Sequence, residues 1–262
     1  MEFKIGDLVT RKSHQHDIVF KIMSMDNGVA ILKGLNVRLC ADSEVEDLSL
    51  YDGTSKNTQD DGYAGDRIKD YLKLDREDYF YLPGKVLHID GDQDYLDRCL
   101  KLYKDSNILA FGVTNKEDEI PKNIRKYLDE INPDIVVITG HDALNLKKGD
   151  KSDLKAYKNS GNFVQAVREA RKYEKAQDKL IIIAGACQSD YEELIKAGAN
   201  FASSPKRINI HALDPAIIAT IISLSSKTED IDLIGIIEKT KYGKDGMGGI
   251  KTTGTMYIGF PR

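Results

Sequence analysis

The segment LIIIAGACQS, residues 180–189, indicates the class of fold to which this chain belongs. Its uninterrupted apolar first half is typical of a strand buried on both faces of a parallel sheet. Two small residues end the run, and Cys187 follows them. Ser189 and Glu192 have the spacing of a capping box, which predicts a helix that starts at Ser189 and ends at Gly198. Cys187 is therefore expected at the carboxyl end of a central strand and just before a helix, where open α/β sheets place their chemistry and a helix start favours a thiolate.

A second run of the same kind, DIVVITGH, covers residues 134–141. It predicts another buried strand, and its end delivers His141. The separation of 46 residues (187 − 141) leaves room for one loop, one helix and one strand, which is the connection between parallel neighbours. A lone cysteine or histidine at a strand end is usually a packing residue. The two at equivalent strand ends predict a catalytic pair, with His141 as base for the thiol of Cys187.

The composition is that of an ordinary globular protein, with 41% hydrophobic and 31% charged residues in a chain of 262. A net charge of −4 argues against nucleic acid as the main partner. Cys40, Cys99 and Cys187 are widely spaced and form no CxxC pair, so neither a metal site nor a disulfide framework is predicted. The N-terminus lacks a signal-peptide pattern, and no apolar run reaches membrane-spanning length. We expect a chain that folds in a reducing cytoplasm and has no membrane partner.

Composition divides the chain into three regions. Residues 1–50 contain short apolar runs and a strong hairpin signal at Asp26-Asn27-Gly28, which predicts a small SH3-like β-barrel of five strands. Residues 51–82 are rich in Asp, Lys, Gly, Ser and Asn, as in a charged linker, with one helix near residues 67–72. Residues 83–262 alternate between strand and helix patterns.

This alternation predicts an α/β domain with a doubly wound, flavodoxin-like parallel sheet and helices on both faces. A hairpin over residues 248–260 is expected to close the chain. The strands are predicted at residues 85–90, 107–113, 134–140, 180–184 and 200–204, and the helices at 94–103, 124–131, 163–173, 189–198, 215–223 and 231–239.

The order of the candidate residues resembles the caspase-like (clan CD) cysteine peptidases. Their signature, QAC[RQG]G, follows a histidine by about 50 residues. The segment GACQS at 185–189 keeps three of its five positions. The clan usually has glycine directly after the histidine, whereas this chain has Asp142. The resemblance implies a caspase-like parallel sheet and an oxyanion hole formed by the backbone N–H groups of Cys187 and Asp142.

Six longer blocks of the sequence carry a second resemblance. They are IGDLVTRKS at 5–13, PGKVLHIDGD at 83–92, ITGHDA at 138–143, AGACQS at 184–189, GANFASSP at 198–205 and NIHALDP at 209–215. These blocks resemble the YabG family of sporulation-specific peptidases, and the resemblance covers nearly the whole chain except the linker. It implies a thiol protease of the mother cell that processes spore coat and cortex-related proteins and associates with the developing coat. No cofactor is expected.

The expected reaction is attack of the Cys187 thiolate on a peptide carbonyl, with His141 protonating the leaving amine. Asp90 and Asp92 follow the first strand of the predicted sheet. In related folds this loop lines the pocket for the side chain before the scissile bond, where carboxylates favour arginine or lysine. The alternative is that both aspartates cap the next helix.

Three further hypotheses stay open. The linker carries basic residues at Lys56, Arg67 and Lys69, which offer sites for self-cleavage. The pattern Gly-x-Cys-x-Ser also resembles the nucleophile elbow of amidotransferase-like hydrolases, in which the downstream His211 would be the base. Finally, the chain could bind a spore protein without cutting it.

Overall fold

The two apolar runs form neighbouring parallel strands in the computed structural model, which describes residues 3–53 and 61–262. These strands are β9 (Ile135–Thr139) and β10 (Ile181–Ala184), so the predicted adjacency is confirmed. The chain separates into two units, Met1–Asp60 and Asp61–Arg262. Both strands belong to the second unit.

The first unit is a five-stranded antiparallel sheet in the order β4-β3-β2-β1-β5. Asn27 and Gly28 form the predicted tight turn between β2 and β3, and both have positive φ angles, of 49° and 80°. Because β4 and β5 stand at the two ends of this order, closure into an SH3-like barrel stays a prediction. The strands are β1 (Leu8–Arg11), β2 (Phe20–Asp26), β3 (Val29–Gly34), β4 (Cys40–Glu44) and β5 (Leu48–Leu50), with short 3₁₀ turns η1 (Lys12–His14) and η2 (Val45–Asp47).

The second unit is built on a six-stranded sheet in the order β12-β11-β10-β9-β7-β8. The strands from β8 to β11 are parallel, and only β12 is antiparallel to its neighbour. Numbered along the chain, the parallel strands have the 2-1-3-4-5 order of flavodoxin-like sheets. The direction of the connections therefore reverses between β7 and β9, which is where such sheets bind ligands. The remaining strands are β7 (Val86–Asp90), β8 (Ala110–Thr114), β11 (Phe201–Ser203) and β12 (Met247–Gly249).

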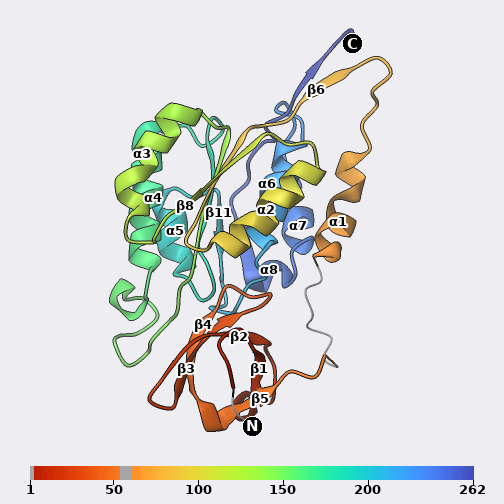
Figure 1. Cartoon of the computed structure of the whole chain (residues 1–262). Helices are drawn as coiled ribbons and strands as arrows, with labels where there is room; N and C mark the ends of the chain where they lie inside the picture. The colour runs from red at the N-terminus through yellow and green to blue at the C-terminus, as the bar shows by residue number, and fades with distance from the viewer. Residues whose placement is uncertain (1–2, 54–60) are drawn as a thin grey trace. The chain divides into compact units, whose positions relative to one another are not determined.

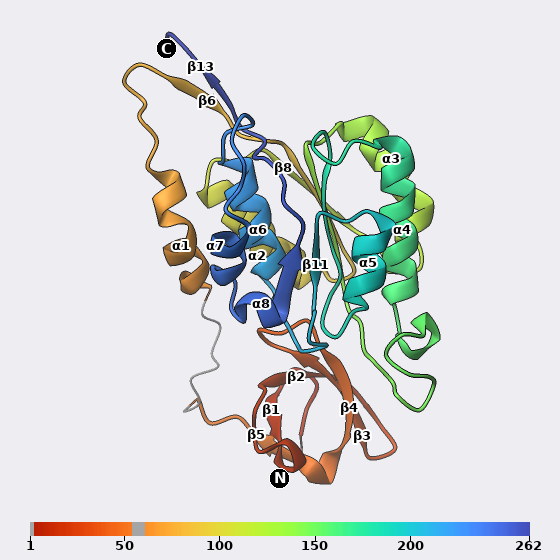
Figure 2. The same cartoon turned by 180° about the vertical axis from the view of Figure 1, so that it is seen from behind.

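Helices cover both faces of this sheet, as predicted (Figure 1). One face packs against α3, α4 and α5 through a core that includes Leu87, Val136, Ile138 and Ile182. The other face packs against α2 and α6, and Figure 2 shows α1 and α7 on this side as well. The helices are α1 (Gly62–Ile68), α2 (Gln93–Asp105), α3 (Ile120–Ile131), α4 (Ser160–Tyr173), α5 (Tyr191–Ala197), α6 (Asp214–Ser223), α7 (Leu233–Glu238) and α8 (Gly243–Gly246), with 3₁₀ turns η3 (Lys69–Leu72) and η4 (Leu154–Ala156).

Two local predictions are wrong. Asp190, not Ser189, is the N-cap of α5, because its side chain accepts the N–H of Glu193. The Ser189 hydroxyl instead accepts the N–H of Ala186. The second error is the hairpin over residues 248–260.

The two halves of that expected hairpin pair with different strands. β12 adds an antiparallel strand to the edge of the main sheet beside β11, whereas β13 (Tyr257–Gly259) pairs with β6 (Phe80–Leu82). An unpaired sheet edge offers a row of backbone donors and acceptors, so β12 gains more backbone hydrogen bonds by pairing with β11 than from a local turn.

The structure describes residues 51–53 and 61–82 of the expected linker. The first of these segments belongs to the first unit, and the second belongs to the second unit and contains α1, η3 and β6. Its helix covers Gly62–Ile68, somewhat earlier than the sequence indicates. Across the described residues, none of the helices combines the length and the apolar character needed to cross a bilayer.

Candidate active site

His141 and Cys187 lie the same number of residues beyond one pair of neighbouring residues in strands β9 and β10. Ile138 of β9 pairs with Ala184 of β10, and each candidate lies three residues beyond its strand partner. The register offset (184 − 138) equals the offset between the candidates (187 − 141), which is 46 residues in both cases. Both side chains therefore belong to loops that leave the same carboxyl edge.

The loop after His141 and the loop that carries Cys187 are hydrogen-bonded to each other. The Ser189 hydroxyl donates to Oδ2 of Asp142 at 2.9 Å. The backbone N–H of Leu144 donates to Oε1 of Gln188 at 3.1 Å. The structure thus joins two segments that are 46 residues apart in the sequence.

Asp142 faces the protein interior and is 2% exposed. Burial raises the pKa of its carboxyl group, and hydrogen bonds from several donors oppose that rise. The donors are the backbone N–H groups of Ala143 (2.9 Å) and Asn159 (2.7 Å) and the hydroxyl groups of Ser160 and Ser189. The carboxylate therefore has a structural use, and the oxyanion role of the Asp142 backbone N–H stays a prediction.

Two carboxylates flank the imidazole of His141. Oε1 of Glu117 accepts the backbone N–H of His141 at 2.9 Å and lies 3.5 Å from its Nδ1. Oδ2 of Asp92 lies 3.7 Å from Nε2. The ring of Tyr95, from the first turn of α2, lies 5.6 Å from the imidazole between ring centroids. Glu117 belongs to the loop between β8 and α3, and no motif in the sequence marks it as part of this site.

Two glycines make room for the Glu117 side chain beside His141. A Cβ atom added at Gly91 would stand 2.3 Å from Oε1 of Glu117, and one added at Gly140 would stand 2.7 Å from it. Burial acts to raise the pKa of Glu117, but hydrogen bonds from His141 outweigh it and leave the pKa below its ordinary value. Glu117 is therefore an ionised partner for this histidine. Gly91 follows β7 and Gly140 follows β9, the two strands between which the direction of the connections reverses.

Cys187 is buried, and its thiol contacts the loop between β11 and α6. The N–H of Ile210 donates to Sγ at 3.3 Å, and the carbonyl oxygen of Ile210 lies 3.7 Å from Sγ. Next to it, the N–H of Gln188 donates to Oγ of Ser204 and to the carbonyl of Ile208, both at 3.0 Å. The loop after β11 therefore holds both Cys187 and Gln188.

Asp90 and Asp92 occupy different environments. Asp90 is fully buried, where it accepts the hydroxyl of Thr139 at 2.9 Å and the N–H of Asp92 at 3.0 Å. Asp92 is the N-cap of α2 and accepts the N–H groups of Asp94 and Tyr95. The capping alternative is thus confirmed for Asp92. The pocket role of both aspartates stays a prediction.

His211 lies directly after the residue that contacts the Cys187 thiol. Its Nδ1 accepts the backbone N–H of Leu213 at 3.2 Å, so the neutral ring carries its proton on Nε2. The ring of Tyr63 packs edge-on against it, with 4.8 Å between centroids. A general base for a thiol needs an unprotonated nitrogen, and the Nδ1 of His211 already has a backbone donor. This geometry does not favour His211 as the base.

Comparisons with known proteins agree with the blocks seen in the sequence. Residues 4–261 match the family model described as YabG peptidase U57. The chain is also similar to the sporulation-specific protease YabG of Bacillus subtilis (strain 168), with 42% identity over 286 aligned positions. That alignment covers 100% of this chain and 99% of the relative.

Proposed function

The chain belongs to the YabG family of sporulation peptidases, and we propose that it is a cysteine endopeptidase with Cys187 as nucleophile and His141 as acid and base. The observation that carries this proposal is the shared register of the two residues at one sheet edge. The hydrogen bonds between their loops add support. A thiol and an imidazole held on adjacent loops are the minimal apparatus for acyl transfer.

The reaction has two steps. The Cys187 thiolate forms a bond to the peptide carbonyl carbon, and the C–N bond then breaks as the leaving amine takes a proton from His141. Water next attacks the acyl-enzyme and gives one proton to His141. The C–S bond then breaks, which releases the carboxylic acid product and restores the Cys187 thiolate beside a protonated His141. Glu117 assists by fixing the orientation of the imidazole and stabilising its charged form.

The tetrahedral intermediate needs donors for its oxyanion. We assign the backbone N–H groups of Cys187 and Asp142 to this role. The inward position of the Asp142 carboxylate supports the assignment, since its charge is taken up by interior donors instead of facing the substrate.

The substrates are proteins, and cleavage occurs after arginine or lysine. Asp92 and Glu117 supply negative charge beside His141, at the sheet edge where the substrate side chain would enter. Asp90 is enclosed by Thr139 and the Asp92 loop, so its contribution is to hold that loop in place. Spore coat and cortex-related proteins processed in the mother cell are the substrates that fit this family, and nucleic acid is not the main partner.

Self-cleavage within the expected linker, residues 51–82, is part of the proposal. A peptidase binds its substrate in extended form, whereas Arg67 lies in α1 and Lys69 in η3. Cleavage at either site therefore requires this helical segment to unfold. Lys56 lies outside the described residues. Intact mass after long incubation, with a Cys187→Ala control, tests the idea, and identical stable masses would refute it.

The main experiment compares wild type with Cys187→Ala, His141→Ala and His211→Ala on a denatured basic protein, with new termini mapped by mass spectrometry. We expect cleavage after arginine or lysine by wild type and His211→Ala, and none by the other two. Thermal melting of each variant checks that it is folded. Cleavage by His141→Ala but not by His211→Ala would move the chain to the amidotransferase-like class. No cleavage by any folded protein would favour a binding module.

A further inference from the structure

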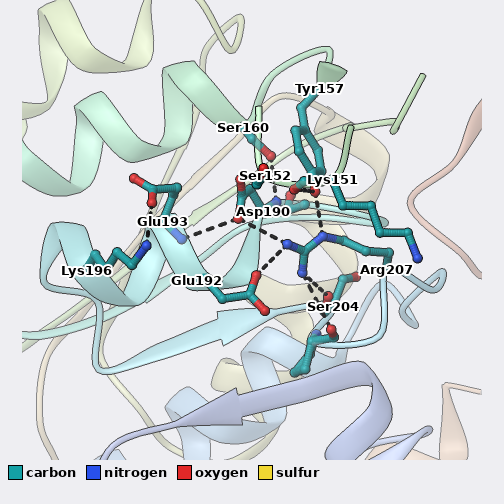
Figure 3. Close-up of polar contacts among 12 residues, drawn as sticks. Lys151, Ser152, Tyr157, Ser160, Asp190, Glu192, Glu193, Lys196, Ser204 and Arg207 are labelled. Atoms are coloured by element: carbon teal, nitrogen blue, oxygen red, sulfur yellow. Dashed lines mark hydrogen bonds and ion pairs between the residues drawn. The ribbon is translucent and has the colours of Figure 1, made fainter. Parts of the chain in front are cut away.

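Arg207 joins three segments of the second unit through its guanidinium group (Figure 3). Its Nε donates to the hydroxyl of Tyr157 at 2.6 Å, and the guanidinium also packs over that ring, 5.6 Å from the centroid. Its Nη2 donates to Oδ1 of Asp190 at 3.1 Å and to Oε2 of Glu192. Arg207 is thus bound to the segment before α4 and to the start of α5, the helix that follows the Cys187 loop.

The same guanidinium also holds its own loop. Nη1 donates to the carbonyl oxygens of Ser204 and Pro205, at 3.3 and 3.5 Å. The backbone of Arg207 has a φ of 57°, in the left-handed region that non-glycine residues rarely adopt. The side-chain contacts offset the cost of this conformation and bend the loop sharply at this point.

The loop bent by Arg207 reaches the proposed nucleophile. Beyond the bend, the Ile208 carbonyl accepts the N–H of Gln188 at 3.0 Å, and the Ile210 N–H donates to Sγ of Cys187 at 3.3 Å. A hydrogen-bond donor aimed at a sulfur atom favours the charged thiolate over the thiol. The contact of Sγ with the Ile210 carbonyl oxygen, which favours the thiol, is longer, at 3.7 Å. The position of that donor depends on where the loop is anchored.

We propose that Arg207 is a positioning residue for Cys187: it anchors the loop between β11 and α6 so that the Ile210 N–H stabilises the thiolate. This inference rests on the proposed role of Cys187 as the nucleophile. Arg207 does not touch the reacting atoms, and it acts through the backbone of its loop.

The requirement for arginine follows from the number and direction of the contacts. One planar group serves a tyrosine hydroxyl, two carbonyl oxygens and two carboxylates, whereas a lysine ammonium is a point charge with three donors. Burial acts to lower the pKa of Arg207, but hydrogen bonds to Glu192 and Tyr157 outweigh it and raise the pKa, so the guanidinium stays charged. Burial raises the pKa of Asp190, whose Oδ2 is a buried atom with no hydrogen bond in the described part of the chain.

The side chain of Arg207 is 10% exposed, and its hydrogen-bond partners are polar groups. Its charged contacts line a pocket together with other lysine and glutamate side chains. The pocket residues are Lys151, Ser152, Asp190, Glu192, Glu193, Lys196, Pro205, Lys206 and Arg207.

Other titratable groups near Cys187 do not belong to this cluster. Burial raises the pKa of Tyr242, and the charges of Asp214 and Cys187 raise it further, which places this tyrosine within electrostatic range of the thiol. His211 adjoins Ile210 along the chain, and His141 is the proposed base. All of these groups stay unchanged in variants of Arg207 and Tyr157.

The test is the pH dependence of iodoacetamide alkylation at Cys187 in the full-length protein, followed by mass spectrometry of the peptide that contains it. In Arg207→Gln we expect the midpoint of the profile to rise by about one pH unit, the effect of weakening one hydrogen bond to a charged group. Tyr157→Phe removes one contact and should give a smaller rise. Lys206→Gln, an exposed change on the same loop, should leave the profile in place.

Two results would overturn the inference. One is an unchanged midpoint in both Arg207→Gln and Tyr157→Phe while thermal melting shows that they are folded. The other is faster alkylation at every pH with the same midpoint, which would mean that the loop only covers the thiol. Peptidase activity that survives in Cys187→Ser would instead refute the proposed function, whatever the alkylation profiles show.

Discussion

Asp142 and Ser189 are hydrogen-bonded side chain to side chain at 2.9 Å, which joins the residue after His141 to the second residue after Cys187. Ser160, at the start of α4, takes part in the same network, because its hydroxyl donates to Asp142 and accepts the N–H of Asp190 at 2.7 Å. One buried carboxylate therefore fixes the spacing between the two loops on which the proposed chemistry depends.

Removing this carboxylate should weaken both folding and activity. Asp142→Ala leaves the interior donors without their acceptor, and we expect the free energy of unfolding in urea to fall by about 3 kcal/mol or more. Ser189→Ala removes two hydrogen bonds, the one to Asp142 and the one from the Ala186 N–H, and should cost about 2 kcal/mol. Ser152→Ala, at an exposed hydroxyl bonded to Asp150, is the control and should change stability by less than about 0.5 kcal/mol. Equal losses in all three would contradict a special role for Asp142.

Glu117→Gln tests the carboxylate partner of His141. The variant keeps the size of the side chain and an oxygen for the backbone N–H, but it loses the charge that stabilises the imidazolium. Because acid and base catalysis by a positioned group contributes about 10²–10⁴-fold, we expect kcat to fall by at least about tenfold with a small change in KM. Steady-state kinetics on a peptide with arginine before the scissile bond measure both. An unchanged kcat would show that Glu117 only supports the loop.

Gly140→Ala should reduce activity at little cost in stability. The added Cβ would displace the Glu117 carboxylate, the movable end of a flexible side chain, from its place beside His141. In the Glu117→Gln background the same change should have little further effect on kcat, since the two act through one contact. Gly161→Ala is the matched control, because a Cβ at that position meets no atom within 4 Å. Additive losses in the double variant would separate Gly140 from Glu117.

Asp214 should make folding stability depend on pH. The residue is fully buried, and burial raises its pKa from 3.8 to about 6 although Tyr63 and backbone N–H groups donate to it. The folded state therefore holds a proton that the unfolded state releases above pH 4. Stability should fall as pH rises from about 4 to about 6, by about 3 kcal/mol for a shift of two pKa units.

Urea unfolding of wild type and Asp214→Asn across this pH range measures the effect. Because asparagine does not titrate, the variant should lack this fall, although it should be less stable at pH 4.5, where its amide cannot reproduce all of the acceptors. Asp118→Asn, at an exposed carboxylate, should keep the wild-type pH dependence. A parallel fall in Asp214→Asn would assign the effect to other groups.

The strands of the second unit could be predicted because burial leaves a local pattern. Continuous apolar runs such as residues 134–140 and 180–184 are hydrophobic on both faces, and only a strand covered by helices on both sides buries them. The alternation of strands and helices then predicts a parallel sheet, and the 46-residue spacing predicts neighbours. Each of these signals lies within one segment or one crossover.

The predictions that were wrong or missing concern interactions between segments that are distant in the sequence. Ser189 has the spacing of a cap, but Asp142 competes for its hydroxyl from 47 residues away, and Asp190 takes the capping position. Glu117 has no motif of its own, since it meets His141 only when the loops after β8 and β9 reach the same edge. β12 pairs with β11 and β13 pairs with β6 because the tertiary fold brings these segments side by side.

Hydrophobic periodicity is a property of consecutive residues, so the amino-acid order alone predicts the strand before Cys187, the strand before His141 and the class of the fold. Which side chains surround these two residues depends on the tertiary structure. A hydrogen bond depends on distances of about 3 Å between atoms, and no local pattern records such a distance when the partners are tens of residues apart. The Glu117–His141 contact and the network around Asp142 therefore became visible only once the strands were arranged in the sheet.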